Sequence, residues 1–404
     1  MASWIAARFP SPFNPAKTQT FKEHFGTPIV TKLDSPLTLF WKDVLNIVIH
    51  LHLLPGVLRP FFTTTPTDEL YPFPPQGISL WWWTAASLVQ LPLVLTIFVV
   101  GLLAISVIQL LTTIHDLIFW DIIQGPELQV YPSNLPSTGY NPKHRWVFLN
   151  GIAVSGQGLH ANLKVLSETF HAPVLGVHNR TYGLLGDLVE CIFQRSFGYR
   201  TLDTRLAVPI LKRFLEADEA AVERVILVAH SQGGICASHV LEQIYQEVSW
   251  DRIKGRLEVY TFGSAALRFE NPWVDKEETG RLVEHMEHYC HEEDMVCRFG
   301  ALSSLKMKDE VYRGKCFVWK GRPGHLLNQH YLKDMFGGVS EVDRPGSFLQ
   351  GRIERYDGTG GNRWYVTPGV KTIRGEQKVK DVSDLWKYMV GSDARPALNG
   401  RKHS

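Results

Sequence analysis

The chain is poor in cysteine, and the cysteines it has follow no motif. Five cysteines are scattered over 404 residues, and no two of them stand as C-x-x-C. A disulfide framework or a zinc site needs paired or closely spaced cysteines, so we expect neither, and we expect no cofactor. An odd number of isolated cysteines favours an intracellular compartment, where thiols stay reduced.

A strong excess of charge is also missing. The chain has 42 Lys and Arg against 40 Asp and Glu, which gives a net charge of +2, and it contains no long basic run. This balance argues against nucleic acid as a partner. The first 30 residues hold no compact apolar run, so no secretory signal is expected there.

The longest stretch without a charged residue is the most informative one. No Asp, Glu, Lys or Arg occurs from Leu70 to Ile114. Within that stretch Leu91 to Leu111 is almost wholly apolar and supplies the roughly 20 residues that cross a bilayer. Tryptophans at 81–83 precede it, where indole rings would lie at the level of the headgroups. The sequence therefore predicts one transmembrane helix within 80–115 and a single-pass membrane protein.

The rest of the chain divides around that segment. Residues 1–75 are rich in proline and predict an irregular region with one short apolar helix after Leu45, either packed or interfacial. Residues 116–140 again contain several prolines and predict a linker. Residues 341–404 are rich in glycine and charge and predict a C-terminal extension, in which 385–389 form a short amphipathic piece that lies on the domain or on a membrane surface.

Residues 141–340 alternate apolar runs with helical patterns. Such alternation is typical of an α/β domain with a mostly parallel sheet covered by helices on both faces. The expected strands cover 146–152, 173–178, 225–229, 257–262, 282–290 and 316–320.

Ser231 stands at a sharp predicted strand-to-helix turn of this domain. The uninterrupted apolar run from Val225 to Ala229 predicts a buried strand, and helical spacing resumes after Gly233-Gly234. A serine hydroxyl held on a tight strand-to-helix turn is accessible to a base and to a substrate. Ser231 is therefore the candidate nucleophile.

The elbow sequence Ala-His-Ser-Gln-Gly-Gly at 229–234 resembles that of the lipase-like serine hydrolases of the α/β-hydrolase superfamily. It departs from their pattern at Ala229, where glycine is usual. The resemblance implies an α/β-hydrolase fold and an oxyanion hole built from backbone N–H groups. The first donor is the N–H of Gln232. The second is the N–H of Ile152, in an Asn-Gly-Ile turn where Asn150 replaces the usual histidine, a departure that leaves a neighbouring residue as the alternative.

The same resemblance implies an acid and a base downstream, in that order. Asp294, at the end of a predicted strand, is the candidate acid, and Glu292 and Glu293 compete with it. His325, in a Gly-His turn before the last predicted helix, is the candidate base, and His330 is the alternative.

Histidines at 285, 288 and 291 recur beside acidic residues, but a strand turns His288 away from the other two, so we expect no metal site. The sequence as a whole predicts a serine hydrolase that cleaves a carboxylic ester, with a lipid ester as the expected substrate. An acyltransferase or thioesterase with the same triad, or an inactive scaffold at a membrane, are the alternatives. No pattern indicates an oligomeric state.

Overall fold

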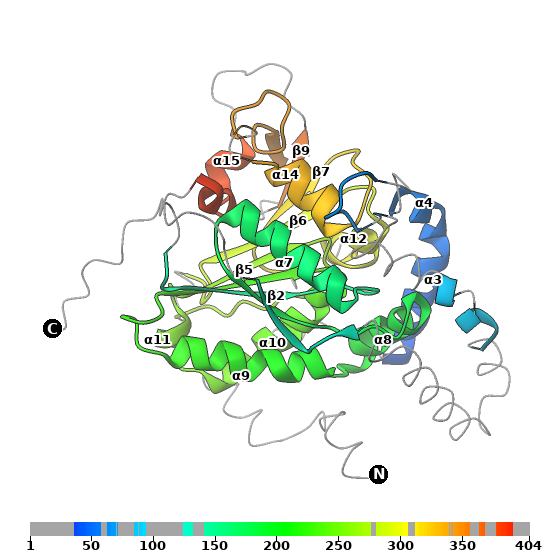
Figure 1. The fold of residues 1–404 in the computed structure, drawn as a ribbon, viewed down its shortest axis with the longest axis horizontal. Helices are drawn as coiled ribbons and strands as arrows, with labels where there is room; N and C mark the ends of the chain where they lie inside the picture. The colour runs from blue at the N-terminus through cyan, green and yellow to red at the C-terminus, as the bar shows by residue number, and fades with distance from the viewer. Residues whose placement is uncertain are drawn as a thin grey trace, which may run out of the picture.

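The structure is a computed structural model that describes the segments 36–57, 63–69, 71, 85–87, 89–93, 124–131, 141–275, 280–305, 312–338, 340, 342–355, 363–367 and 377–390. In these segments the chain forms a nine-stranded sheet with helices on both faces (Figure 1). This architecture confirms the mostly parallel α/β sheet predicted from the sequence.

The strands run in the spatial order β1-β3-β2-β4-β5-β6-β7-β9-β8. Pairing is parallel from β3 through to β9, and β1 and β8 close the two edges in the antiparallel sense. Their bounds are β1 Leu128–Tyr131, β2 His144–Leu149, β3 Val174–Val177, β4 Arg224–His230, β5 Leu257–Phe262, β6 His285–His291, β7 Lys315–Trp319, β8 Arg352–Arg355 and β9 Arg363–Thr367.

Helices cover both faces of the sheet. Figure 1 shows α7 and α14 on one face and α9 and α10 on the other. The helices are α3 Pro36–His50, η1 Leu51–Leu53, α4 Leu54–Val57, α7 Gly156–Phe170, α8 Leu184–Phe197, α9 Leu202–Glu216, α10 Gln232–Glu247, α11 Trp250–Ile253, α12 Met295–Phe299, α13 Ala301–Leu305, η3 Leu327–Leu332, α14 Lys333–Phe336, α15 Val379–Val382 and η5 Leu385–Val390.

The core lies along the central strands. All seven residues of β4 and all six of β5 are buried, because helices cover both sides of these strands. A strand buried on both faces needs no alternation of polar and apolar residues, which explains why an unbroken apolar run marked β4 in the sequence. The predicted strands at 225–229 and 257–262 coincide with β4 and β5.

The sheet extends beyond the predicted domain at both edges. β1 lies inside the predicted linker of 116–140 and pairs with β3, while β8 and β9 lie inside the predicted extension. The edge strand β1 has only four residues, and its exposed positions are the apolar Leu128 and Val130, so no alternation of buried apolar and exposed polar residues marks it in the sequence. Prolines at 126 and 132 bracket it at positions that an edge strand tolerates.

The N-terminal region also differs from prediction, because α3 begins at Pro36, earlier than the apolar helix expected after Leu45. Proline is favoured in the first helical turn, where its missing N–H has no partner to lose. Residues 85–87 and 89–93 of the predicted transmembrane helix are helical, and the rest of 80–115 lies outside the described residues. None of the described helices combines the length and the apolar character needed to cross a bilayer.

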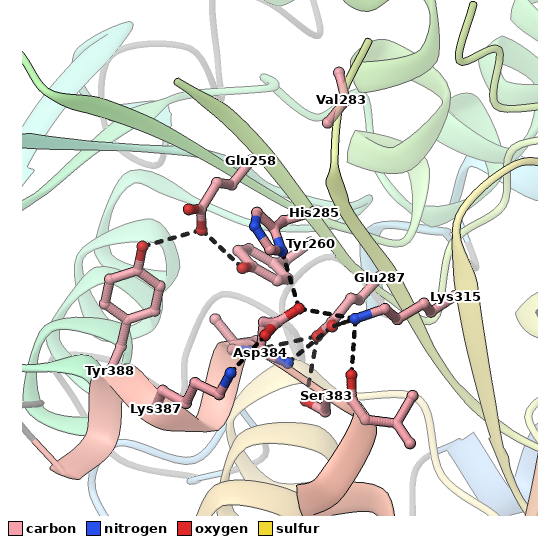
Figure 2. Close-up of polar contacts among 12 residues, drawn as sticks. Glu258, Tyr260, Val283, His285, Glu287, Lys315, Ser383, Asp384, Lys387 and Tyr388 are labelled. Carbon is pink, nitrogen blue, oxygen red and sulfur yellow. Dashed lines mark hydrogen bonds and ion pairs between the residues drawn. The ribbon is translucent and has the colours of Figure 1, made fainter. Parts of the chain in front are cut away.

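The C-terminal segment packs on the domain, at the amino ends of the parallel strands. Leu385 and Met389 of η5 are fully buried, which agrees with the docked alternative for 385–389. Figure 2 shows the polar contacts beneath this segment, where Asp384 and Glu287 both face the amine of Lys315. The Nζ atom of Lys315 lies 2.8 Å from the Oδ2 of Asp384 and 3.3 Å from the Oε1 of Glu287.

Glu287 lies at the centre of this cluster, fully buried at the start of β6. Its carboxylate accepts hydrogen bonds from the backbone N–H of Asp384, the hydroxyl of Ser383 and the phenol of Tyr289. Burial opposes the charge of Asp384, but hydrogen bonds from His285 and Lys315 outweigh it and lower the pKa of Asp384. The segment is therefore held by buried, hydrogen-bonded charges as well as by apolar packing.

Candidate active site

Ser231 occupies a strained turn between β4 and α10. Its φ of 57° is in the left-handed region, which residues other than glycine rarely adopt. The backbone around it is held on both sides, since the N–H of Ser231 donates to the carbonyl of Phe262 at 3.1 Å and the N–H of Ala265 donates to the carbonyl of Ser231 at 3.0 Å. β5 and the loop that follows it thus stabilise a conformation that serine would not adopt alone.

Two glycines make this turn sterically possible. A Cβ atom at Gly233 would overlap the carbonyl oxygen of Leu149, and one at Gly151 would lie 2.6 Å from the Cβ of Ser231. The loop after β2 therefore touches the elbow, as the predicted oxyanion turn requires. Ala229 is fully buried and paired with both neighbouring strands, so its methyl group is accommodated where the resembled family carries glycine.

His325 bridges Ser231 and Asp294. Its Nε2 lies 2.8 Å from the Oγ of Ser231, and its Nδ1 lies 2.8 Å from the Oδ2 of Asp294. Because a carboxylate can only accept, Nδ1 carries the proton and Nε2 is left to accept from the serine hydroxyl. All three side chains are at least nine-tenths buried.

Asp294 is held in its ionised form. It caps the amino end of α12 by accepting the N–H of Val296 at 2.8 Å, and its Oδ2 also accepts the phenol of Tyr331 at 2.7 Å. Burial alone would raise the pKa of Asp294, but the charge of His325 and the hydrogen bonds from His325 and Tyr331 outweigh it and lower that pKa. Tyr331 was not predicted, because no local pattern relates a tyrosine to an aspartate 37 positions before it.

The competing residues lie elsewhere. The Nδ1 of His330 accepts the backbone N–H of Leu326 at 2.9 Å, which places it in the helical turn below His325. The carboxylate of Glu292 accepts the N–H of Gly321 at 2.8 Å, and Glu293 is exposed. The structure thus brings Ser231 together with His325 and Asp294.

His230, next to the nucleophile, is a neutral neighbour of His325. Its Nε2 donates to the carbonyl oxygen of His325 at 2.8 Å, and the two rings stack with centroids 4.8 Å apart. Burial, followed by the charge of His325, lowers the pKa of His230 to about 3. His230 therefore fixes the backbone of the His325 loop without adding a charge to the site.

Asp187, on α8, holds the loop that contains Ile152. The Oδ2 of Asp187 accepts the backbone N–H of Ala153 at 2.8 Å and the hydroxyl of Thr181, and its Oδ1 accepts the N–H of Tyr182 at 2.6 Å. Burial raises the pKa of Asp187 to about 6, against the effect of these hydrogen bonds. Because the N–H of Ala153 is already bound, Ile152 remains the candidate for the second oxyanion donor.

The side chain of Gln232 is fixed by a separate network. Its Oε1 accepts the amide of Asn179 at 2.5 Å, and its Nε2 donates to Glu190 and Gln194, each at 3.0 Å. Asn179 is itself bound to Asn150 through two hydrogen bonds, so this network connects the two predicted oxyanion loops. Polar residues clustered after β3 and in α8 were the sequence signal for it, but nothing in their spacing linked them to the elbow.

The three histidines of β6 have separate partners. His285 contacts Asp384 at 2.9 Å, His288 contacts the hydroxyl of Thr261 at 2.7 Å, and the Nδ1 of His291 contacts the carbonyl of Gly324 at 3.1 Å. Within the described segments, no group of His, Cys, Asp or Glu side chains has the geometry of a metal site.

An apolar pocket opens beside Ser231. It is walled by α3 on one side and by α8, α12 and the loop after β2 on the others; the lining residues are Asn46, Ile47, His50, Ile152, Leu188, Cys191, Ser231, Ala265, Met295, Val296 and Phe299. Ile152 and Ser231 thus border the same space. The contribution of α3 was not predicted, since nothing in a local pattern shows which distant elements a helix will meet.

No protein-family model matches the chain, and neither does any curated protein. Solved structures of esterases are similar to about half of it, at low identity. A hyperthermophilic esterase from the archaeon Pyrobaculum calidifontis aligns over 48% of this chain and 71% of its own, with 13% identity and a TM-score of 0.29. An esterase from Mycobacterium marinum aligns over 49% of this chain and 68% of its own, with 13% identity and a TM-score of 0.28.

A thermostable carboxylesterase from a metagenomic library aligns over 49% of this chain and 75% of its own, with 16% identity and a TM-score of 0.28.

Proposed function

We propose that this chain is a serine hydrolase that cleaves a carboxylic ester. The observation that carries the proposal is the unbroken chain of 2.8 Å contacts from Ser231 through His325 to Asp294, at a strained turn beside an apolar pocket. A nucleophile with an oriented base and a buried acid is the arrangement that acyl transfer requires.

The reaction follows from the protonation states. The Oγ of Ser231 attacks the ester carbonyl carbon while the Nε2 of His325 takes the hydroxyl proton, and Asp294 stabilises the imidazolium that forms. Backbone N–H groups of Gln232 and Ile152 hold the oxyanion. His325 then protonates the departing alcohol, and a water molecule, activated by the same histidine, releases the carboxylic acid and restores Ser231.

We further propose a lipid ester as the substrate, taken up by a protein anchored in a membrane through residues 91–111. Two features support this. The pocket beside Ser231 is lined mainly by apolar side chains, which favour a hydrocarbon group. The apolar run from Leu91 to Leu111 would keep the site close to lipid.

Labelling with a fluorophosphonate probe tests the nucleophile. The wild-type chain should react at Ser231, and Ser231→Ala should abolish both labelling and ester hydrolysis, lowering kcat by about 10⁴-fold or more. Ser238→Ala is a matched control, because Ser238 is a buried serine of α10 whose hydroxyl donates to the carbonyl of Arg268.

The same experiment separates the alternatives. A folded wild-type chain that never reacts with the probe would support the inactive scaffold and contradict the proposal. A chain that labels but transfers its acyl group to added alcohols faster than to water would be an acyltransferase with the same site.

A further inference from the structure

Helix α8 exposes only apolar side chains. The residues of α8 that are exposed are Val189, Phe193 and Phe197, and their spacing of four places them along one stripe of the helix. A helix on the surface of a globular protein normally directs charged and polar residues to solvent. The outer stripe of α8 therefore resembles a surface that meets an apolar phase.

Helix α3 presents a second apolar surface. Four of its large apolar side chains are between 56% and 59% exposed: Trp41, Leu45, Val48 and Ile49. The ring of Phe40 on α3 meets that of Phe193 on α8, with centroids 6.5 Å apart. The two stripes are therefore neighbours, and we call these seven exposed residues of α3 and α8 the α3–α8 face.

The two helices are fixed to each other beneath this face. Asp43 of α3 and Arg195 of α8 form an ion pair at 3.3 Å, and both side chains are at least 95% buried. Arg195 also lies over the ring of Phe299 at 3.6 Å, which connects the pair to α12. The α3–α8 face is thus part of a rigid assembly that surrounds the pocket.

The inner sides of the same helices line the pocket beside Ser231. Ile47 and His50 come from α3, and Leu188 and Cys191 come from α8. The exposed apolar face and the pocket are consequently the outer and inner sides of one pair of helices. A surface that covers the α3–α8 face therefore also lies against the two helices that wall the pocket.

The described start of the apolar run lies beside these helices. The amide of Gln90 donates to the carbonyl of Tyr182, just before α8, at 2.7 Å. The helical residues 89–93 therefore begin the apolar run of 91–111 beside the α3–α8 face, and Val89 and Leu91 are themselves exposed. An apolar run of that length needs a bilayer or an enclosing core.

We infer that the α3–α8 face rests on a lipid bilayer, so that the substrate passes from the membrane to Ser231 between α3 and α8. This inference rests on the proposed function and adds to it a surface and an orientation. Apolar side chains at this density lie in the region between headgroups and acyl chains. The bilayer is the occupant because the apolar run of 91–111, which is long enough to cross it, begins at the helical residues 89–93 beside the same face.

An environment-sensitive fluorophore tests the contact directly. The five native cysteines are buried, so Leu45→Cys gives the full-length protein one accessible thiol for the dye NBD. In phosphatidylcholine vesicles the emission should shift to the blue and strengthen. Glu219→Cys is the control, because this exposed residue follows α9 near the amino ends of the strands and should stay in water.

Emission from the Leu45→Cys label that is unchanged by vesicles would overturn the inference. A blue shift that depends on protein concentration and not on lipid would overturn it as well, because the face would then be covered by a second copy. Neither result would bear on whether Ser231 is a nucleophile.

Activity on two substrates completes the test. The double variant Leu45→Lys/Val48→Lys should hydrolyse a vesicle-embedded fluorogenic ester at least about tenfold more slowly, because two charges resist transfer to the interface. Its rate on a water-soluble short-chain ester should be unchanged. Equal loss on both substrates would contradict docking, whereas a wild-type chain inactive on both would contradict the proposed function itself.

Discussion

The carboxylate of Asp187 accepts the backbone N–H of Ala153 at 2.8 Å, so a side chain of α8 holds the loop that follows β2. Ala153 has a φ of 54°, a left-handed conformation that costs alanine free energy. The neighbouring residue, Ile152, is the proposed source of the second oxyanion donor. Asp187 is therefore a positioning residue that acts on the site through the backbone.

Asp187→Asn should reduce kcat for a soluble ester by roughly tenfold to a hundredfold, with a smaller effect on KM. The amide introduced at position 187 would turn an N–H group toward at least one of the donors that the carboxylate now accepts. For comparison, the loss of one oxyanion donor lowers kcat by about 10²- to 10³-fold. The measurement is steady-state kinetics on protein corrected for its folded fraction.

Asp203→Asn is the matched control for that variant. Asp203 is also a buried aspartate in the first turn of a helix, α9, and its neighbours Thr201, Thr204 and Cys236 do not belong to the loop that follows β2. An equal fall of kcat in both variants would mean that buried charge in general, and not the Ala153 contact, is responsible.

Alanine variants of the two candidate bases should differ in kcat. His325→Ala should lower kcat by about 10³-fold or more, since general-base catalysis is lost. His330→Ala should stay within about threefold of wild type per folded molecule, and lose about 1 kcal/mol of stability with the hydrogen bond to Leu326. A larger kinetic effect from His330 than from His325 would reverse the assignment.

The elbow was predictable because its signal is local: a buried strand, a serine, two glycines and a helix follow one another within about 20 residues. Asp294 and His325 needed the resemblance, because only the fold brings residues 63 and 94 positions from Ser231 to its side. The walls of the pocket could not be predicted. Asn46 and His50 line the pocket beside Ser231 through tertiary packing of α3, for which the sequence carries no pattern.

Domain bounds were less predictable than strands. The predicted linker and extension contain β1, β8 and β9, which are short strands at or near the edges of the sheet. Most of their side chains are exposed or half-buried, so these strands lack the continuous apolar run of a strand buried on both faces. The same reasoning explains why β4 and β5 were predicted within a residue or two.

Glu69 should make stability depend on pH. It belongs to the segment 63–69, which packs on η3, and its Oε1 accepts the N–H of Asn328 at 2.9 Å. Its Oε2 is buried and has no hydrogen-bond partner among the residues that the structure describes. Burial raises the pKa of Glu69 from 4.5 to about 7, against the opposing hydrogen bond from Asn328. The folded state therefore binds the proton more tightly than the unfolded state.

The stabilisation of the folded state by the proton on Glu69 is therefore complete below pH 4.5 and is lost as the pH rises through about 7. Glu69→Gln keeps the acceptor for Asn328 and removes the titration, so its urea midpoint should fall less between about pH 5 and about pH 8 than that of wild type. Glu293→Gln, at an exposed carboxyl, should keep the wild-type dependence. If the urea midpoint of the Glu69→Gln variant depended on pH as strongly as that of wild type, Glu69 would not titrate in this window.

The C-terminal segment 377–390 should contribute strongly to the stability of the fold. A chain that ends at residue 376 leaves Glu287 and Lys315 without Asp384 and Ser383, and a buried carboxylate that loses its partners is strongly destabilising (Figure 2). Its urea midpoint should therefore be far below that of wild type. A chain that ends at Val390 keeps these contacts and should unfold at the wild-type urea concentration.

A single substitution in this cluster should separate stability from chemistry. Asp384→Asn should cost about 1–3 kcal/mol of unfolding free energy, since Asp384 and Lys315 are partly exposed. The cluster lies at the amino ends of β5, β6 and β7, whereas Ser231 lies at the carboxyl end of β4. The folded Asp384→Asn protein should therefore retain wild-type kcat, and a loss of kcat without a loss of stability would contradict this separation.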